Sequence, residues 1–264
     1  MSFGPFDKGV SEFAKVIGRP DDQARMLIIF FAAYPIAYIY RFLHGRMIRH
    51  FYSIILGIFL HVFMFREGAI HYWALGLVVY LIMTFMNRRT QAPVVLVVWM
   101  THLSIMHIKR LFFDYGSWSM DATTFLMPLV WRLSSLGFCY RDGMDEKEGY
   151  IRQEQEDRKV KSKPTIIEIL SYTSYPGSNI CGPFFEFRDY KDFIEENGRY
   201  KNIPSSWSAT FTKLLIGFGC IAFCVFIVPH AEFPLVLTEE FYNRSYWMQV
   251  PLFLLYGMGT RATY

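Results

Sequence analysis

The chain has 264 residues, of which 53% are hydrophobic and 19% aromatic, while only 19% are charged. A mean hydropathy of +0.20 is too high for an ordinary soluble enzyme, and apolar residues gathered in long runs are typical of membrane proteins. The net charge of +4 leaves no basic footprint for nucleic acid, so we expect no nucleic-acid partner.

The cysteines and the first residues exclude two further classes of protein. The cysteines lie in or beside apolar segments and form no C-x-x-C pair, so we expect buried thiols and neither a disulfide framework nor a metal site. They are Cys139, Cys181, Cys220 and Cys224. Residues 1–25 contain acidic side chains and no apolar core, which does not fit a cleaved signal peptide.

Five apolar runs in the first part of the chain are candidates for membrane-spanning helices, which need about 17–25 mostly apolar residues. The runs are 26–43, 51–65, 69–87, 92–108 and 122–140. Pro35 predicts a kink in the first run, and Arg66-Glu67-Gly68 predicts a turn after the second. The fifth run is weaker because it contains Arg132, a charge that is costly in lipid.

Two more apolar runs, 209–229 and 245–259, come later. Together the runs predict an all-α polytopic membrane protein with about seven transmembrane or re-entrant helices plus interfacial helices, and residues 1–264 as a single membrane domain. The loop 141–165 is rich in Lys and Arg, so the positive-inside rule predicts a cytosolic loop and a lumenal or external N-terminus. Its mixed charges favour a solvated surface helix or linker.

The segment 165–185 is interrupted twice, by Pro176-Gly177 and by Gly182-Pro183. Proline removes a helix hydrogen bond and glycine adopts unusual torsions, so a simple spanning helix is not expected. Irregular backbone at membrane depth survives only when it is buried in protein or lines a wet cavity. The sequence therefore predicts a broken or re-entrant segment beside a cavity.

The residues after this segment alternate on a helical period. Phe187, Tyr190, Phe193 and Ile194 fall on one face, and charged residues fall largely on the other. This pattern predicts an interfacial helix in the headgroup plane. It is either an ordinary amphipathic connector or one wall of a lateral lipid entrance.

Buried polar residues are the remaining candidates. His61 and His102 lie within apolar runs, where an interhelical hydrogen bond is expected, whereas His44 and His50 are expected to face lipid headgroups. For Arg132, the run 122–140 either tilts, lies partly at the interface, or pairs this charge inside the protein; alternatively, Arg132 faces a reaction chamber and meets a phosphate from CoA or lipid.

Several blocks, taken in order, resemble the lysophospholipid acyltransferase branch of the membrane-bound O-acyltransferase superfamily. The segment "CGPFFEFRDYKDF" (181–193) resembles a Gly-Pro-x-x-x-x-x-x-Tyr motif of that branch. The other blocks are 18–43, with its Pro-x-Asp-Gln entry and Tyr-Pro pair, 49–73, 107–143, which ends in Asp-Gly, and 163–172. No single block is specific, but their order and spacing carry the resemblance.

The resemblance implies a multi-helix membrane enzyme of phospholipid remodelling in the endoplasmic reticulum. Such an enzyme transfers an acyl chain from acyl-CoA, its co-substrate, to the free hydroxyl of a lysophospholipid, without another cofactor. By the same resemblance, substrate-chamber candidates are Gly182, Pro183 and Tyr190, and the buried charge adds Arg132.

The family also implies a catalytic histidine in a Trp-His-Gly-like block and an asparagine in a Trp-Asn-like block. We find neither block in this sequence and expect both beyond Tyr264, so we assign no catalytic residue here. The chain is then expected to be the N-terminal portion of an acyltransferase and to be inactive alone. The alternative is a non-catalytic lipid-binding or regulatory membrane protein.

Overall fold

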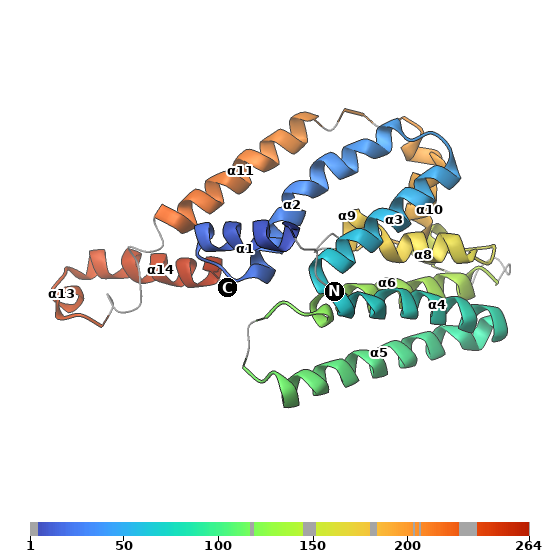
Figure 1. Ribbon diagram of the computed structural model, residues 1–264, viewed down its shortest axis with the longest axis horizontal. Coiled ribbons are helices and arrows are strands. Elements are labelled where there is room, and N and C mark those ends of the chain that lie inside the picture. Colours follow the sequence, from blue (N-terminus) through green and yellow to red (C-terminus); the bar gives the residue numbers. More distant parts are fainter. Residues whose placement is uncertain are drawn as a thin grey trace. The chain divides into compact units, whose positions relative to one another are not determined.

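The computed structural model describes residues 5–116, 119–144, 152–179, 184–202, 204–205, 207–226 and 237–263. The regular secondary structure within these ranges is entirely helical, which confirms the predicted class (Figure 1). The chain divides into two compact units, Met1–Lys201 and Asn202–Tyr264. A single membrane domain therefore stays a prediction, and each unit is described by itself.

The first unit contains most of the helices. They are α1 Pro5–Ile17, α2 Asp21–Ile39, α3 Arg46–Phe65, α4 Ile70–Phe85, α5 Arg88–Phe113, α6 Ala122–Asp142, α7 Gln153–Arg158, α8 Ile166–Ser174, α9 Pro176–Asn179 and α10 Phe187–Glu195. The described part of this unit also has short 3-10 helices, η1 Tyr40–Phe42 after α2, η2 Arg66–Ala69 between α3 and α4, and η3 Gly198–Tyr200 after α10. The second unit contains α11 Trp207–Phe226, α13 Glu239–Tyr242 and α14 Tyr246–Thr263.

Three helical stretches among the described residues are long and apolar enough to cross a membrane, namely Asp21–Phe42, Arg46–Phe85 and Arg88–Phe113. The middle stretch holds α3 and α4, which meet at the expected turn, where Arg66 has a φ of 52°. The helix expected at 122–140 is present as α6, but it is not among these three stretches. The expected count of about seven spans is thus not confirmed.

The break before Pro176 is present. Helix α8 ends at Ser174, and Tyr175 has a ψ of 116° because a following proline disfavours the helical region. With nine residues, α8 is only about 13 Å long, which is too short to cross a bilayer. The second break, at Gly182-Pro183, lies outside the described residues.

Helix α8 packs between α3 and α4, and glycines on both helices make room for it. A Cβ added to Gly57 of α3 would lie 2.6 Å from the Cβ of Ser174 and would collide with its carbonyl oxygen. A Cβ on Gly76 of α4 would lie 3.1 Å from Oγ1 of Thr173. Close packing of this kind needs small residues, because lipid supplies no hydrophobic drive between helices.

Helix α6 is the central helix of the first unit and is buried along most of its length. It packs mainly along α5 (Figure 1). Gly137 of α6 faces Ala92 of α5 in this contact. The amide of Gln91 crosses this contact and donates to the carbonyl oxygen of Gly137 at 2.7 Å. Because α6 is buried in this way, Arg132 in its middle is surrounded by protein.

The predicted burial of the cysteines is confirmed at one position and wrong at another. Cys139 is a buried thiol in α6, but Cys220 is exposed on α11 within the second unit. The Cys220 thiol is exposed because most of the described side chains of α11 lie at the surface of the second unit. Cys181 lies outside the described residues.

Candidate functional site

Arg132 lies in the middle of α6 and is 2% exposed. Its guanidinium donates a hydrogen bond to the carbonyl oxygen of Tyr172 in α8. The same group lies over two aromatic rings, 4.4 Å from the centroid of Tyr172 and 4.8 Å from that of Phe185. Such cation–π contacts stabilise a desolvated cation by about 2 kcal/mol. Arg132 thus connects α6 to α8 and to the segment that leads into α10.

Tyr190 of α10 reaches the same place from the other side and is also 2% exposed. Its ring packs against Tyr172 with 5.4 Å between centroids, and its hydroxyl donates to Oγ of Ser53 at 3.3 Å. Two predicted chamber residues, Arg132 and Tyr190, are thus brought together around Tyr172. The other two, Gly182 and Pro183, lie outside the described residues.

Helix α10 forms where predicted, but its apolar face contacts protein. Phe187, Tyr190 and Ile194 are buried against other helices of the first unit. The ring of Tyr172 in α8 covers this face, and the placement of α10 in the headgroup plane stays a prediction. Whether α10 borders a lipid entrance stays a prediction.

A buried polar network next to Tyr190 was not foreseen. Nδ1 of His50 lies 2.7 Å from Oγ of Ser171, and the hydroxyl of Tyr40 lies 2.7 Å from Oγ of Ser53. His50 is 2% exposed, so its predicted headgroup-facing role is wrong. The spacing of His50, Ser53 and Gly57 on α3 was the available signal, because it puts two polar side chains and a glycine on one face of the helix.

His61 also departs from expectation. It is 1% exposed and stacks on the ring of Tyr72 with 4.1 Å between centroids. Neither of its ring nitrogens has a hydrogen-bond partner among the residues that the structure describes. The predicted interhelical hydrogen bond is therefore absent in this part of the chain, and ring stacking takes its place.

Glu186 is a second unforeseen member of the site. It is buried immediately before α10, and Oγ of Ser135 donates to its carboxylate at 2.6 Å. Arg158 of α7 forms an ion pair with it at 3.5 Å. A buried carboxylate needs such partners, since an isolated charge is costly to desolvate. Glu186 therefore joins α6 and α7 to the start of α10.

Glu168 holds the N-terminus of α8 through a capping box with Thr165. It also forms an ion pair with Lys191 of α10 at 3.0 Å. Burial alone would raise the pKa of Glu168, but the hydrogen bonds from Thr165 and Lys191 outweigh it and lower this pKa. The carboxylate is thus kept charged where α8 and α10 meet.

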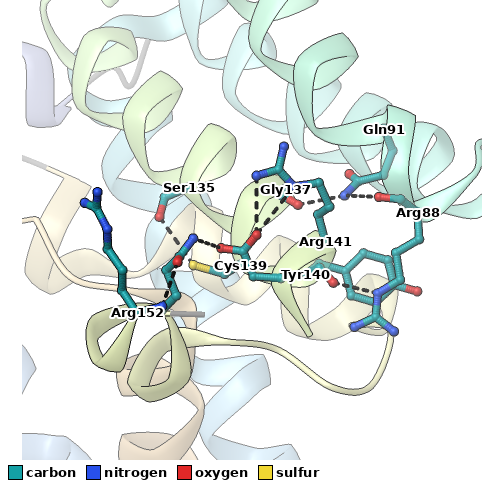
Figure 2. Close-up of polar contacts among 10 residues, drawn as sticks. Arg88, Gln91, Ser135, Gly137, Cys139, Tyr140, Arg141 and Arg152 are labelled. Carbon is teal, nitrogen blue, oxygen red and sulfur yellow. Dashed lines mark hydrogen bonds and ion pairs between the residues drawn. The ribbon is translucent and has the colours of Figure 1, made fainter. Parts of the chain in front are cut away.

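The end of α6 anchors the described part of the basic loop (Figure 2). Arg88 of α5 lies over the ring of Tyr140 at 4.0 Å and donates to the carbonyl oxygen of Val160 at 2.7 Å. Gln155 of α7 donates to Asp142 at 3.1 Å. Helix α7 is a surface helix, as predicted, but these contacts fasten it to the core. Residues 145–151 of the loop lie outside the described residues.

The described side chains form a polar interior that joins α3, α6, α8 and α10. It holds two buried guanidinium groups, those of Arg49 and Arg132, the buried carboxylates of Glu168 and Glu186, and several hydroxyl groups. Such a set suits recognition of a polar group inside an apolar protein. In the part of the chain that the structure describes, no three His, Cys, Asp or Glu side chains gather to hold a metal ion.

Comparisons with known proteins identify relatives. Residues 108–261 match the model of MBOAT, the membrane-bound O-acyltransferase family. The chain is 34% identical over 204 residues to mouse membrane-bound glycerophospholipid O-acyltransferase 1, covering 74% of this chain and 41% of that protein. It is 27% identical over 242 residues to Arabidopsis thaliana lysophospholipid acyltransferase 2, covering 89% and 51%.

A third relative is Drosophila melanogaster lysophospholipid acyltransferase 6, which is 28% identical over 205 residues, covering 76% of this chain and 28% of the relative. The chain thus spans about half the length, or less, of the curated relatives it matches.

Proposed function

We propose an acyl-transfer function for this chain, which belongs to the membrane-bound O-acyltransferase family. The enzyme of which it forms part transfers an acyl group from acyl-CoA to the free hydroxyl of a lysophospholipid. The hydroxyl oxygen bonds to the thioester carbonyl carbon, the carbon–sulfur bond breaks, and the hydroxyl proton ends on the CoA thiol. The names of the relatives, which are lysophospholipid and glycerophospholipid acyltransferases, support this reaction.

The observation that carries the proposal is the family match over residues 108–261. It includes α6, α8 and α10, the helices that hold Arg132, Tyr172 and Tyr190 together. We assign to this chain the scaffold and part of the substrate chamber, with Arg132, Gly182, Pro183 and Tyr190 as chamber residues. The catalytic histidine and asparagine of the family are assigned to sequence outside residues 1–264.

A chimera tests the proposal. Residues 1–264 replace the matching segment of Arabidopsis lysophospholipid acyltransferase 2, and the chimera is expressed in membranes that lack endogenous lysophospholipid acyltransferases. We expect transfer of labelled acyl groups from acyl-CoA to lysophospholipid above the level of empty membranes. A folded chimera without any transfer, beside an active parent enzyme, contradicts the proposal.

Residues 1–264 alone are the matched control, and we expect them to consume no acyl-CoA. Turnover by this chain alone would contradict the assignment of the catalytic groups to other sequence. If the chimera is inactive while the chain binds lysophospholipid, the non-catalytic lipid-binding function replaces the proposal. The proposed location is the endoplasmic reticulum, which fractionation of the tagged chain tests.

A further inference from the structure

A cleft of about 230 Å³ lies on the surface of the first unit. One wall is the extended segment 159–162, which precedes α8, and the other is the charged face of α10. The opposite face of α10 carries Tyr190 into the protein interior. The cleft therefore has a rigid wall, because α10 is fixed by its buried side.

Cations dominate the lining of this cleft. They are Lys159, Lys161, Arg188 and Lys191, and two carboxylates, Asp192 and Glu195, reduce the lining charge from +4 to +2. Glu195 is itself paired with Arg46 at 3.2 Å, outside the cleft. Arg188 is oriented by a hydrogen bond to the backbone carbonyl of Glu156 at 3.1 Å. Two of the cations are paired in the same way, Lys159 with Glu156 and Lys191 with Glu168. The positive charge that these pairs leave to the cleft is carried by Lys161 and Arg188, one on each wall.

We propose that this cleft binds a phosphate group, carried either by an anionic phospholipid or by CoA. A phosphate accepts several charge-assisted hydrogen bonds at once, and ammonium and guanidinium donors on two walls of one cleft can supply them. The hydroxyl of Ser162 adds a neutral donor. The CoA source rests on the proposed acyl transfer, whereas the lipid source does not.

The location suits both sources. The segment 159–162 belongs to the basic loop expected on the cytosolic side, and α10 carries the charged face expected at headgroup level. Juxtamembrane cations attract anionic lipids over about one Debye length. The same position is open to a water-soluble phosphate ester.

Calorimetric titration of the full chain in detergent micelles tests the proposal. The probes are free CoA and dihexanoyl phosphatidic acid, and their phosphate-free counterparts are pantetheine and dihexanoyl glycerol. We expect at least one phosphate-bearing probe to bind, with an affinity that falls at raised ionic strength. We expect Lys161→Glu to weaken binding about tenfold or more, because a charge-assisted donor is replaced by a like charge.

Controls separate the outcomes. Lys201→Glu makes the same charge change at an exposed residue outside the cleft and is expected to leave affinity unchanged. Arg188→Gln is a second cleft variant, and circular dichroism checks the fold of each. Binding of CoA alone or of phosphatidic acid alone identifies the source, and either supports the site.

Absence of binding by both phosphate-bearing probes overturns the proposal, and so does equal binding by both cleft variants and the wild type. These results do not depend on turnover. An active chimera whose cleft binds no phosphate therefore contradicts the phosphate site and leaves the acyl-transfer proposal standing. A chain that binds phosphate but gives an inactive chimera contradicts the acyl-transfer proposal and leaves the phosphate site standing.

Discussion

The glycines of α3 and α11 lie in helices of similar apolar character but in different surroundings. A Cβ added to Gly57 of α3 would collide with the backbone of Ser174, whereas no described heavy atom lies within 4 Å of a Cβ added to Gly217 or Gly219 of α11. The side chains differ in the same way. The face of α3 around Gly57 is buried, while Leu215 and Ile216 of α11 are mostly exposed within their unit.

The difference shows that hydropathy and packing are separate properties of a membrane helix. Apolar residues make a segment compatible with lipid, but lipid solvates them as well as protein does. Small residues and satisfied polar groups determine where helices approach closely. In the first unit, Gly57, Gly76 and Gly137 mark such places. Arg132 provides a polar contact between α6 and α8, and Glu186 one between α6 and the start of α10.

Gly57→Ala is the substitution with the largest expected effect. The added methyl group would collide with the backbone of Ser174, which cannot move without shifting α8. Overpacking usually costs about 1–3 kcal/mol, and an obstacle made of backbone puts this site at about 3 kcal/mol. This net loss already includes the gain in helix propensity, which is about 1 kcal/mol.

We measure the free energy of unfolding of the chain in detergent micelles. Denaturant titration, monitored by tryptophan fluorescence, gives this free energy. Gly137→Ala is the matched control, because its Cβ would meet the Cα of Ala92 at 3.4 Å, a contact that a small shift relieves. Equal losses in the two variants would contradict the view that close approach at α8 sets the cost.

Arg132→Met is expected to destabilise the chain by about 2 kcal/mol. The substitution leaves the carbonyl of Tyr172 without this donor inside the protein and removes the contacts with two rings. The variant no longer buries the guanidinium charge, and this gain offsets part of the loss of stability. Thermal unfolding in the same micelles measures the net loss of stability.

The control for Arg132→Met lies at the end of the same helix. Arg141 is 39% exposed, and its guanidinium lies 4.9 Å from the ring of Phe138. Arg141→Met should change the free energy of unfolding by less than about 0.5 kcal/mol. A comparable loss at both positions would show that the guanidinium of Arg132 adds nothing beyond a surface contact.

Local signals explain which parts of the molecule could be predicted. Apolar runs gave the positions of α2 to α6, and Pro176 gave the end of α8, because both act within a few residues. The amphipathic period of 187–195 likewise gave α10. These features need no knowledge of the tertiary structure.

Long-range contacts explain what was missed. His50 reads as a residue of a basic turn, but Ser171, 121 positions later, covers it. Glu186 reads as one charge in a polar strip until Ser135 and Arg158 meet it. The partner of Arg132 could not be inferred because it is a main-chain carbonyl, which no residue type reveals.

Gly217→Ala is the substitution with the smallest expected effect. No described heavy atom lies within 4 Å of the added Cβ, and alanine favours a helix by about 1 kcal/mol over glycine. We therefore expect no loss of stability and a gain of up to about 1 kcal/mol, measured as for Gly57→Ala. A loss as large as that at Gly57 would show that α11 is closely packed in the folded protein, and the contrast between the two helices would then fail.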